Sequence, residues 1–188
     1  QLYFDFSGYS DMAVGSARLF GVRLPENFNS PYKSTSIIEF WRRWHITLSN
    51  FLRDYLYISL GGNRKGYPRQ LTNLMITMLL GGLWHGAGWT FVFWGGLHGF
   101  SLVVNHLWTC FGGQRRAWLS QTRWFPAVCG VGTFFAVVIS WVWFRAETFA
   151  GAATLLQAMF NGQSLAATLP DIMADNGLAG LALLLLAA

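Results

Sequence analysis

Residues 71–110, LTNLMITMLLGGLWHGAGWTFVFWGGLHGFSLVVNHLWTC, decide the fold class. This stretch contains no Asp, Glu, Lys or Arg, and it is long enough for two membrane-spanning helices of about 20 residues each. The glycine-rich sequence at 81–88 interrupts it, because glycine weakens a helix and frees its backbone. We therefore expect two membrane segments within residues 71–108, on either side of His85.

The two segments differ in length. The first is short for a full span, which favours a kinked, tilted or partly re-entrant helix. The second, from Trp89 to Trp108, is long enough to span. In it, Gly95 and Gly99 would form a small-residue notch that lets a neighbouring helix pack closely.

The whole chain has the composition of a membrane protein. Of its 188 residues, 53% are hydrophobic and only 11% are charged, whereas soluble domains carry about 25% charged residues. Apolar runs predict further membrane helices at residues 1–20 and 125–144 and an incomplete one at 177–188. Since the chain lacks an initiator Met and ends within that last run, we expect a fragment. The predicted fold is all-α: one domain over residues 1–188, a polytopic transmembrane helical bundle truncated at both ends.

Residues 36–57 predict an amphipathic helix. Ser36 can cap its start, and Glu39, three residues later, would complete a capping box. A helix with apolar and polar faces lies along the membrane surface or covers a cavity, rather than spanning the bilayer. At about 100° per residue, the apolar face holds Ile37, Trp41, Trp44, Leu48, Phe51, Leu52, Tyr55 and Leu56, and the polar face holds Glu39, Arg42, Arg43, Asn50, Arg53 and Asp54.

The positive charges are arranged as in the loops of a membrane protein. Eight Lys and Arg residues lie within 22–69 and three within 109–124, whereas 146–176 contain none. The positive-inside rule then places 22–69 and 109–124 in the cytoplasm. Because topology accounts for the net charge of +5, we expect the lipid bilayer as a partner and no nucleic acid.

Four histidines could carry chemistry. His85 lies in the glycine-rich break of a charge-free stretch, and an ionisable side chain in irregular backbone at membrane depth is a functional candidate. It could act as a general base on a hydroxyl, or it could be hydrogen-bonded within a helix junction. His45, beside Trp44, is more typical of a structural interfacial residue. His98 and His106 are more typical of packing or interface anchoring.

The sequence indicates no metal and no bound cofactor. Cys110 and Cys129 fit no metal-binding spacing, and we expect buried thiols at helix ends. The sequence also lacks HExxH and GxSxG motifs, which would indicate a zinc hydrolase or a serine nucleophile.

Three motifs in order give a resemblance to a known family. They are YFDFSGYSDMA at 3–13, FWRRWHITLS at 40–49 followed by Arg53-Asp54-Tyr55, and GLWHGAGW at 82–89. Together they resemble the motifs of the bacterial membrane-bound O-acyltransferase (MBOAT) family, and within it the branch that acetylates alginate. The likeness covers residues 1–105 and continues more weakly to residue 145. Ser59 stands where the family pattern would have proline.

This resemblance implies a bundle of tilted helices around a tunnel across the bacterial inner membrane. His85 matches the family's near-invariant histidine, the expected general base. His45 matches a second position, which would orient the acyl group or the acceptor. The donor, acetyl-CoA or another acyl thioester or carrier, would enter from the cytoplasm. The acceptor would be an exported, alginate-like polysaccharide, with an exported acetyltransferase subunit as a partner on the outer side.

Other functions stay open. The same family motifs would suit D-alanyl transfer to teichoic acid, or acetyl transfer to peptidoglycan or cellulose. A different class is a non-catalytic scaffold or a transporter in a polysaccharide export complex, since transporters also use broken helices with a polar residue near the midplane. A scaffold should tolerate loss of His85, whereas an enzyme should not.

Overall fold

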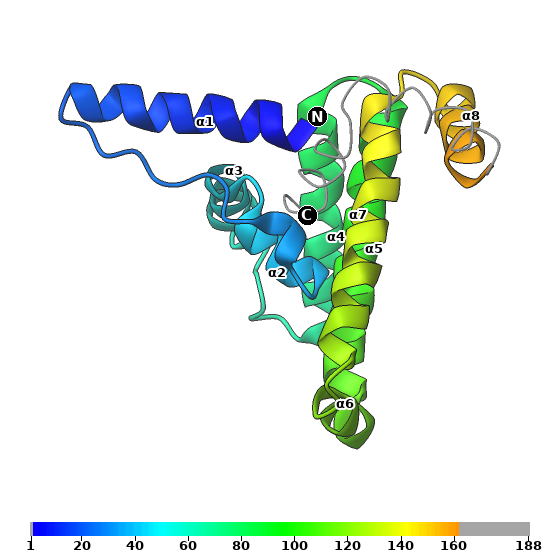
Figure 1. Ribbon diagram of the computed structural model, residues 1–188. Coiled ribbons are helices and arrows are strands. Elements are labelled where there is room, and N and C mark those ends of the chain that lie inside the picture. Colours follow the sequence, from blue (N-terminus) through cyan, green and yellow to red (C-terminus); the bar gives the residue numbers. More distant parts are fainter. Residues whose placement is uncertain (1, 162–188) are drawn as a thin grey trace.

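The computed structural model describes residues 2–161, and every element in this part of the chain is helical (Figure 1). The predicted all-α class is therefore confirmed for these residues, while the helix expected at 177–188 lies outside them. In chain order the elements are α1 (Leu2–Leu19), the 3₁₀ turn η1 (Pro31–Lys33), α2 (Ile37–Arg43), α3 (Ile46–Phe51), the π-helical turn η2 (Leu52–Tyr57), α4 (Tyr67–His85), α5 (Trp89–Phe111), α6 (Gly113–Ser120), α7 (Phe125–Arg145) and α8 (Phe149–Phe160).

Helices α4, α5 and α7 stand side by side as the body of the structure (Figure 1). The backbones of α4 and α5 meet where two glycines face each other. A Cβ added to Gly82 would lie 2.3 Å from the carbonyl oxygen of Phe91, and one added to Gly95 would lie 2.3 Å from the carbonyl oxygen of Met78. A side chain on Gly99 would press on Met75. The predicted notch at Gly95 and Gly99 is therefore confirmed.

The helix break around His85 is narrower than the sequence predicts. α4 continues through Gly81 and Gly82 and ends at His85, so the non-helical backbone is confined to 86–88. Gly81 and Gly82 serve packing instead, because both are buried, against Leu52 and against α5. The two helices occupy the positions expected within 71–108.

Helix α7 corresponds closely to the membrane helix predicted at 125–144. Among the described residues it is the one helix that is long and apolar enough to cross a membrane, judged by length and composition. The polytopic arrangement of α4 and α5 therefore stays a prediction. α1 occupies the position expected at 1–20. Its first half packs through Tyr3 and Phe6 against Phe28 and reaches Asn27 through Ser10, and its second half extends away from α4, α5 and α7 (Figure 1).

The prediction of one continuous helix at 36–57 is wrong. The chain forms α2, then breaks at Trp44 and His45, and resumes as α3 and the π-helical η2. Trp44 is extended, with φ −101° and ψ 128°. His45 is left-handed, with φ 44° and ψ 55°, a conformation that non-glycine residues rarely adopt.

Tertiary packing explains this break. Extending Trp44 places its ring in the core, 4.8 Å from the ring of Trp141 and 5.0 Å from that of Phe28. The backbone groups freed by the break find partners in the loop before η1. The N–H of Asn29 donates to the carbonyl of Arg43, and the N–H of Ile46 donates to the carbonyl of Asn27, both at 2.9 Å. A straight helix would satisfy its own backbone but would lose the burial of Trp44.

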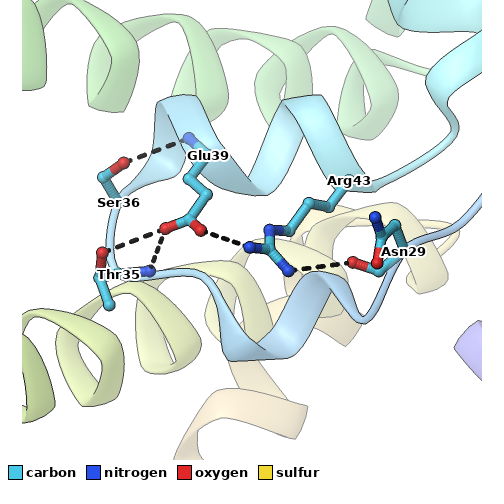
Figure 2. A network of polar contacts seen from close by, with 5 residues as sticks. All are labelled: Asn29, Thr35, Ser36, Glu39 and Arg43. Atoms are coloured by element: carbon cyan, nitrogen blue, oxygen red, sulfur yellow. Dashed lines mark hydrogen bonds and ion pairs between the residues drawn. The ribbon is translucent and has the colours of Figure 1, made fainter.

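The predicted cap of α2 is half confirmed. The Ser36 hydroxyl accepts the N–H of Glu39 at 3.2 Å, as a capping box requires. The Glu39 carboxylate, however, accepts from the backbone and hydroxyl of Thr35, at 2.9 and 3.1 Å, and pairs with Arg43 at 2.8 Å. Arg43 also donates to the carbonyl of Asn29 (Figure 2). This network fixes the end of α2 to the loop before η1.

The predicted apolar face of residues 36–57 is buried only in its first half. Ile37, Trp44 and Leu48 are buried, whereas Phe51 and Tyr55 are 54% and 71% exposed. The burial of this face therefore ends within α3, between Leu48 and Phe51, and not at the break at His45.

We expect Gly95→Ala to destabilise the protein by about 1–3 kcal/mol, because the added methyl overlaps the α4 backbone and the helices must separate. Gly132→Ala is the matched control, since a Cβ there meets nothing within 4 Å. Thermal unfolding of the full-length protein would measure both. Equal stability of the two variants would contradict the close α4–α5 approach.

Candidate active site

His45 is held at the α2–α3 break by groups from two other segments. Its Nδ1 lies 3.1 Å from Oδ1 of Asn27. Its ring meets the ring of Phe6 from α1 edge-on, with centroids 4.8 Å apart, and the ring of Phe28 lies 6.3 Å away. The imidazole is therefore half-buried among aromatic side chains, with one nitrogen engaged.

The surroundings keep His45 neutral near neutral pH. Burial, and to a smaller degree the charge that neighbouring His85 would carry, lower the pKa of His45 from 6.5 to about 4. A neutral imidazole has one N–H and one free lone pair, so it can accept a proton or a hydrogen bond. The neutral imidazole is compatible with the predicted role of His45 in orienting the acyl group or the acceptor.

His85 is the last residue of α4 and is half-buried. Its ring meets three aromatic rings edge-on: Trp84 at 5.0 Å, Trp94 at 5.2 Å and Phe144 at 5.2 Å. None of the side-chain hydrogen bonds within residues 2–161 involves it, so the alternative of a histidine bonded within the helix junction finds no support there. Within this part of the chain, no protein group forms a hydrogen bond with its ring nitrogens.

A continuous series of ring contacts connects the two histidines. His45 contacts Phe28, which packs on Trp44. Trp44 packs on Trp141 of α7. Trp141 in turn lies 5.5 Å from Phe144, whose ring meets His85 at 5.2 Å. The helix break and the end of α4 are thus brought to one aromatic region, consistent with the electrostatic influence of His85 on His45.

A separate cavity of about 440 Å³ lies beside this region. Neither His45 nor His85 lines it, but Ile46, next to His45 in the chain, does, and so does Trp41, whose ring lies 6.0 Å from that of Trp94. Its polar lining comprises Arg42, Ser49, Asn50, Arg53, Tyr57, Asn63, Gln70, Thr77 and His106. Within residues 2–161 the ion pairs join Arg43 to Glu39 and Arg53 to Asp54. The guanidinium of Arg42 has no acidic partner there.

His98 has a structural role, as the sequence favours. It is 2% exposed, and its Nε2 lies 2.7 Å from the Ser140 hydroxyl. That hydroxyl donates to the carbonyl of Val137 at 2.7 Å, so His98 donates to it and joins α5 to α7.

The prediction of buried cysteines is wrong, because Cys110 is exposed and Cys129 is half-buried. In the described part of the chain, no three His, Cys, Asp or Glu side chains are grouped as metal ligands would be.

Comparison with known proteins places these residues in a family. The model of the membrane-bound O-acyltransferase family, MBOAT, matches residues 1–144. The chain is 53% identical over 162 residues to the probable alginate O-acetylase AlgI of Pseudomonas putida, covering 86% of this chain and 32% of that protein. It is 49% identical over 172 residues to the peptidoglycan O-acetyltransferase of Helicobacter pylori, covering 88% and 31%. It is 34% identical over 158 residues to the teichoic acid D-alanyltransferase of Streptococcus thermophilus, covering 76% and 38%.

The chain therefore belongs to the membrane-bound O-acyltransferase family. It spans about a third of the length of the curated relatives named above. Both candidate histidines, His45 and His85, lie within the matched residues.

Sequence reasoning missed Asn27. The segment at 27–31 reads as a turn, from its Asn, Ser and Pro residues, and nothing in the local pattern shows that it would meet the α2–α3 break. The contact depends on a helix interruption that the amphipathic pattern does not predict.

We expect the free energy of unfolding of the full-length protein to decrease as the pH falls from about 6.5 to about 4. Over this interval His45 is protonated in the unfolded chain but not in the folded protein, so a fall in pH favours unfolding. Above pH 6.5 His45 is neutral in both states, and its contribution to the free energy of unfolding no longer changes with pH. His45→Gln removes the titration and should show a smaller decrease in thermal unfolding at fixed pH. An identical pH dependence of the two proteins would contradict the lowered pKa.

Proposed function

We propose that the protein containing this chain is an O-acyltransferase of the bacterial inner membrane. It moves an acetyl group from a cytoplasmic thioester donor to hydroxyls of an exported polysaccharide. The observation that carries this proposal is the 53% identity to an alginate O-acetylase over 86% of the chain. The convergence of His45 and His85 on one aromatic region supports it, because acyl transfer to an alcohol needs a base beside the hydroxyl.

His85 is the general base in this proposal. A ring nitrogen takes the proton of the acceptor hydroxyl while its oxygen attacks the acyl carbonyl carbon and the new C–O bond forms. Collapse of the tetrahedral intermediate breaks the C–S bond, and the departing thiolate takes the proton from His85. The rings of Trp94 and Phe144 beside His85 limit the entry of water, which would otherwise hydrolyse the donor.

The 440 Å³ cavity is the donor side of the site in this proposal. Its lining combines apolar side chains with the guanidinium group of Arg42, which has no acidic partner within residues 2–161. This combination suits an acyl thioester that carries phosphate groups. The cavity is formed by α2, α3, η2 and the α4–α5 hairpin, and the positive-inside rule places residues 22–69 in the cytoplasm. An exported acetyltransferase subunit would then receive the acyl group, or position the polysaccharide, on the opposite side.

Peptidoglycan acetylation is the second candidate. The identity to the Helicobacter pylori peptidoglycan O-acetyltransferase, 49% over 88% of the chain, is close to that for the alginate enzyme. The identity to the D-alanyltransferase is lower, at 34%, which favours acetyl over D-alanyl transfer. The acceptor polysaccharide is therefore best determined in the cell that produces the protein.

His85→Ala in the full-length protein should reduce the O-acetyl content of the exported polysaccharide to near background, because loss of a general base costs about 10²–10⁴-fold in rate. Chemical determination of O-acetyl groups, with membrane abundance measured by blot, checks this. Leu83→Ala is the control, since Leu83 is 52% exposed and lies on the same helix. Normal acetylation by an abundant His85→Ala variant would instead favour the scaffold or transporter function.

Arg42→Gln should raise the KM for acetyl-CoA by about 5-fold with little change in kcat, because it removes one charge contact worth about 1 kcal/mol. Steady-state kinetics of the full-length protein in membranes would measure both constants. Arg64→Gln, an exposed arginine outside the cavity lining, should leave the KM unchanged. A wild-type KM in the Arg42 variant would remove this cavity from donor binding.

A further inference from the structure

We propose that Asn27 is a positioning residue that holds the proton of His45 on Nδ1 and leaves Nε2 as a hydrogen-bond acceptor for a hydroxyl of the acceptor sugar beside the one that reacts. The inference rests on the proposed function, in which His45 contributes to acyl transfer. It adds a residue outside the three family motifs quoted above, and it specifies which of the two substrates His45 contacts.

The side-chain amide of Asn27 joins three segments of the chain. Its Oδ1 lies 3.3 Å from the backbone nitrogen of Thr47, 2.9 Å from the Thr47 hydroxyl and 3.1 Å from Nδ1 of His45. Its Nδ2 donates to the Ser10 hydroxyl of α1 at 3.3 Å. The amide therefore links α1 and the following loop to the start of α3.

These contacts determine the tautomer of His45. A backbone N–H can only donate, so the Asn27 atom facing Thr47 must be the oxygen, and this settles the amide orientation that geometry alone often leaves open. The same oxygen faces Nδ1 of His45, and two acceptors cannot form a hydrogen bond. The Thr47 hydroxyl is farther from Nδ1, at 3.4 Å, and donates to Asn27 Oδ1 at 2.9 Å. The nearer partner of Nδ1 is therefore the Asn27 oxygen, which assigns the proton to Nδ1. The ring is neutral near neutral pH, so Nε2 has a free lone pair.

Asn27 also supports the unusual backbone on which the ring is mounted. His45 has a positive φ of 44°, a conformation that costs an L-residue free energy and persists only when its surroundings hold it. The Asn27 carbonyl accepts the N–H of Ile46 at 2.9 Å, directly after His45. One residue thus fixes both the backbone and the ring orientation of His45.

The tautomer distinguishes the two roles open to His45. Orienting the acyl carbonyl, or stabilising the oxyanion that develops from it, would require an N–H donor. A bare Nε2 can instead accept an O–H of the acceptor sugar. The geometry therefore assigns His45 to a neighbouring hydroxyl of the acceptor sugar, which it orients, while the attacking hydroxyl gives its own proton to His85.

The tautomer can be measured in the intact protein without reference to activity. Full-length protein labelled with ¹⁵N-histidine in membranes should show an Nδ1–H, bare Nε2 signal that disappears in His45→Gln. Asn27→Ala should abolish this tautomer and lower kcat by about 10-fold or more, because the ring is no longer aligned. Asn29→Ala is the matched control: Asn29 is exposed in the same loop and contacts Arg43 through its backbone, so tautomer and kcat should be unchanged.

Asn27→Asp provides a readout that a purely structural role would not alter. The carboxylate keeps an acceptor facing Nδ1 and Thr47, so the Nδ1–H tautomer should persist and kcat should exceed that of Asn27→Ala. Its negative charge favours the protonated imidazole and raises the pKa of His45. The acid limb of the pH–rate profile should therefore move to higher pH than in the wild type.

The outcomes separate the two proposals. A His45 that carries its proton on Nε2 in the wild type overturns the positioning role of Asn27. So does full activity of Asn27→Ala in a protein that His85→Ala inactivates, and in that case the transferase function stands. Full acetylation by His85→Ala overturns the proposed function itself, whatever the tautomer.

Discussion

The site depends on a pair of backbone hydrogen bonds between the loop before η1 and the break in the α2–α3 region. Asn29 donates to the carbonyl of Arg43, and Ile46 donates to the carbonyl of Asn27. Backbone groups left unpaired inside a protein cost free energy comparable to a lost hydrogen bond. The extended Trp44 and left-handed His45 are therefore stable only because the loop supplies these partners, and the position of His45 follows from that pairing.

The break has a second consequence, in the aromatic core. It turns the Trp44 ring onto Trp141 of α7, and Trp141 packs on Phe144 beside His85. Aromatic rings bury large areas and have preferred contact geometries, so they maintain the relation between elements distant in the chain. The close approach of α4 and α5 at Gly82 and Gly95 then holds the end of α4 against this core. In the proposed enzyme, two histidines from separate chain breaks thereby serve one reaction.

Much of this arrangement follows from local sequence patterns. The uncharged stretch around His85 predicts the α4–α5 hairpin, and the apolar run at 125–144 predicts α7, because helix length and apolarity are properties of a single segment. The break at Trp44 and His45 could not be predicted, because the amphipathic pattern continues through it and the forces that produce it come from Phe28, Trp141 and the Asn27 loop. His85 was identifiable as a candidate from its glycine-rich setting. Asn27 was not, because its role depends entirely on that unexpected break.

The central claim is that His45 and His85 belong to one site, and it can be tested by cross-linking in membranes. The full-length protein would carry Cys110→Ser and Cys129→Ser, together with His45→Cys and His85→Cys, and be treated with a short bifunctional thiol reagent. The control pairs His85→Cys with His106→Cys, whose positions lie toward opposite ends of the α4–α5 hairpin. The account predicts efficient cross-linking of positions 45 and 85 and little in the control. Cross-linking of 45 and 85 no faster than the control, at normal abundance, would contradict it.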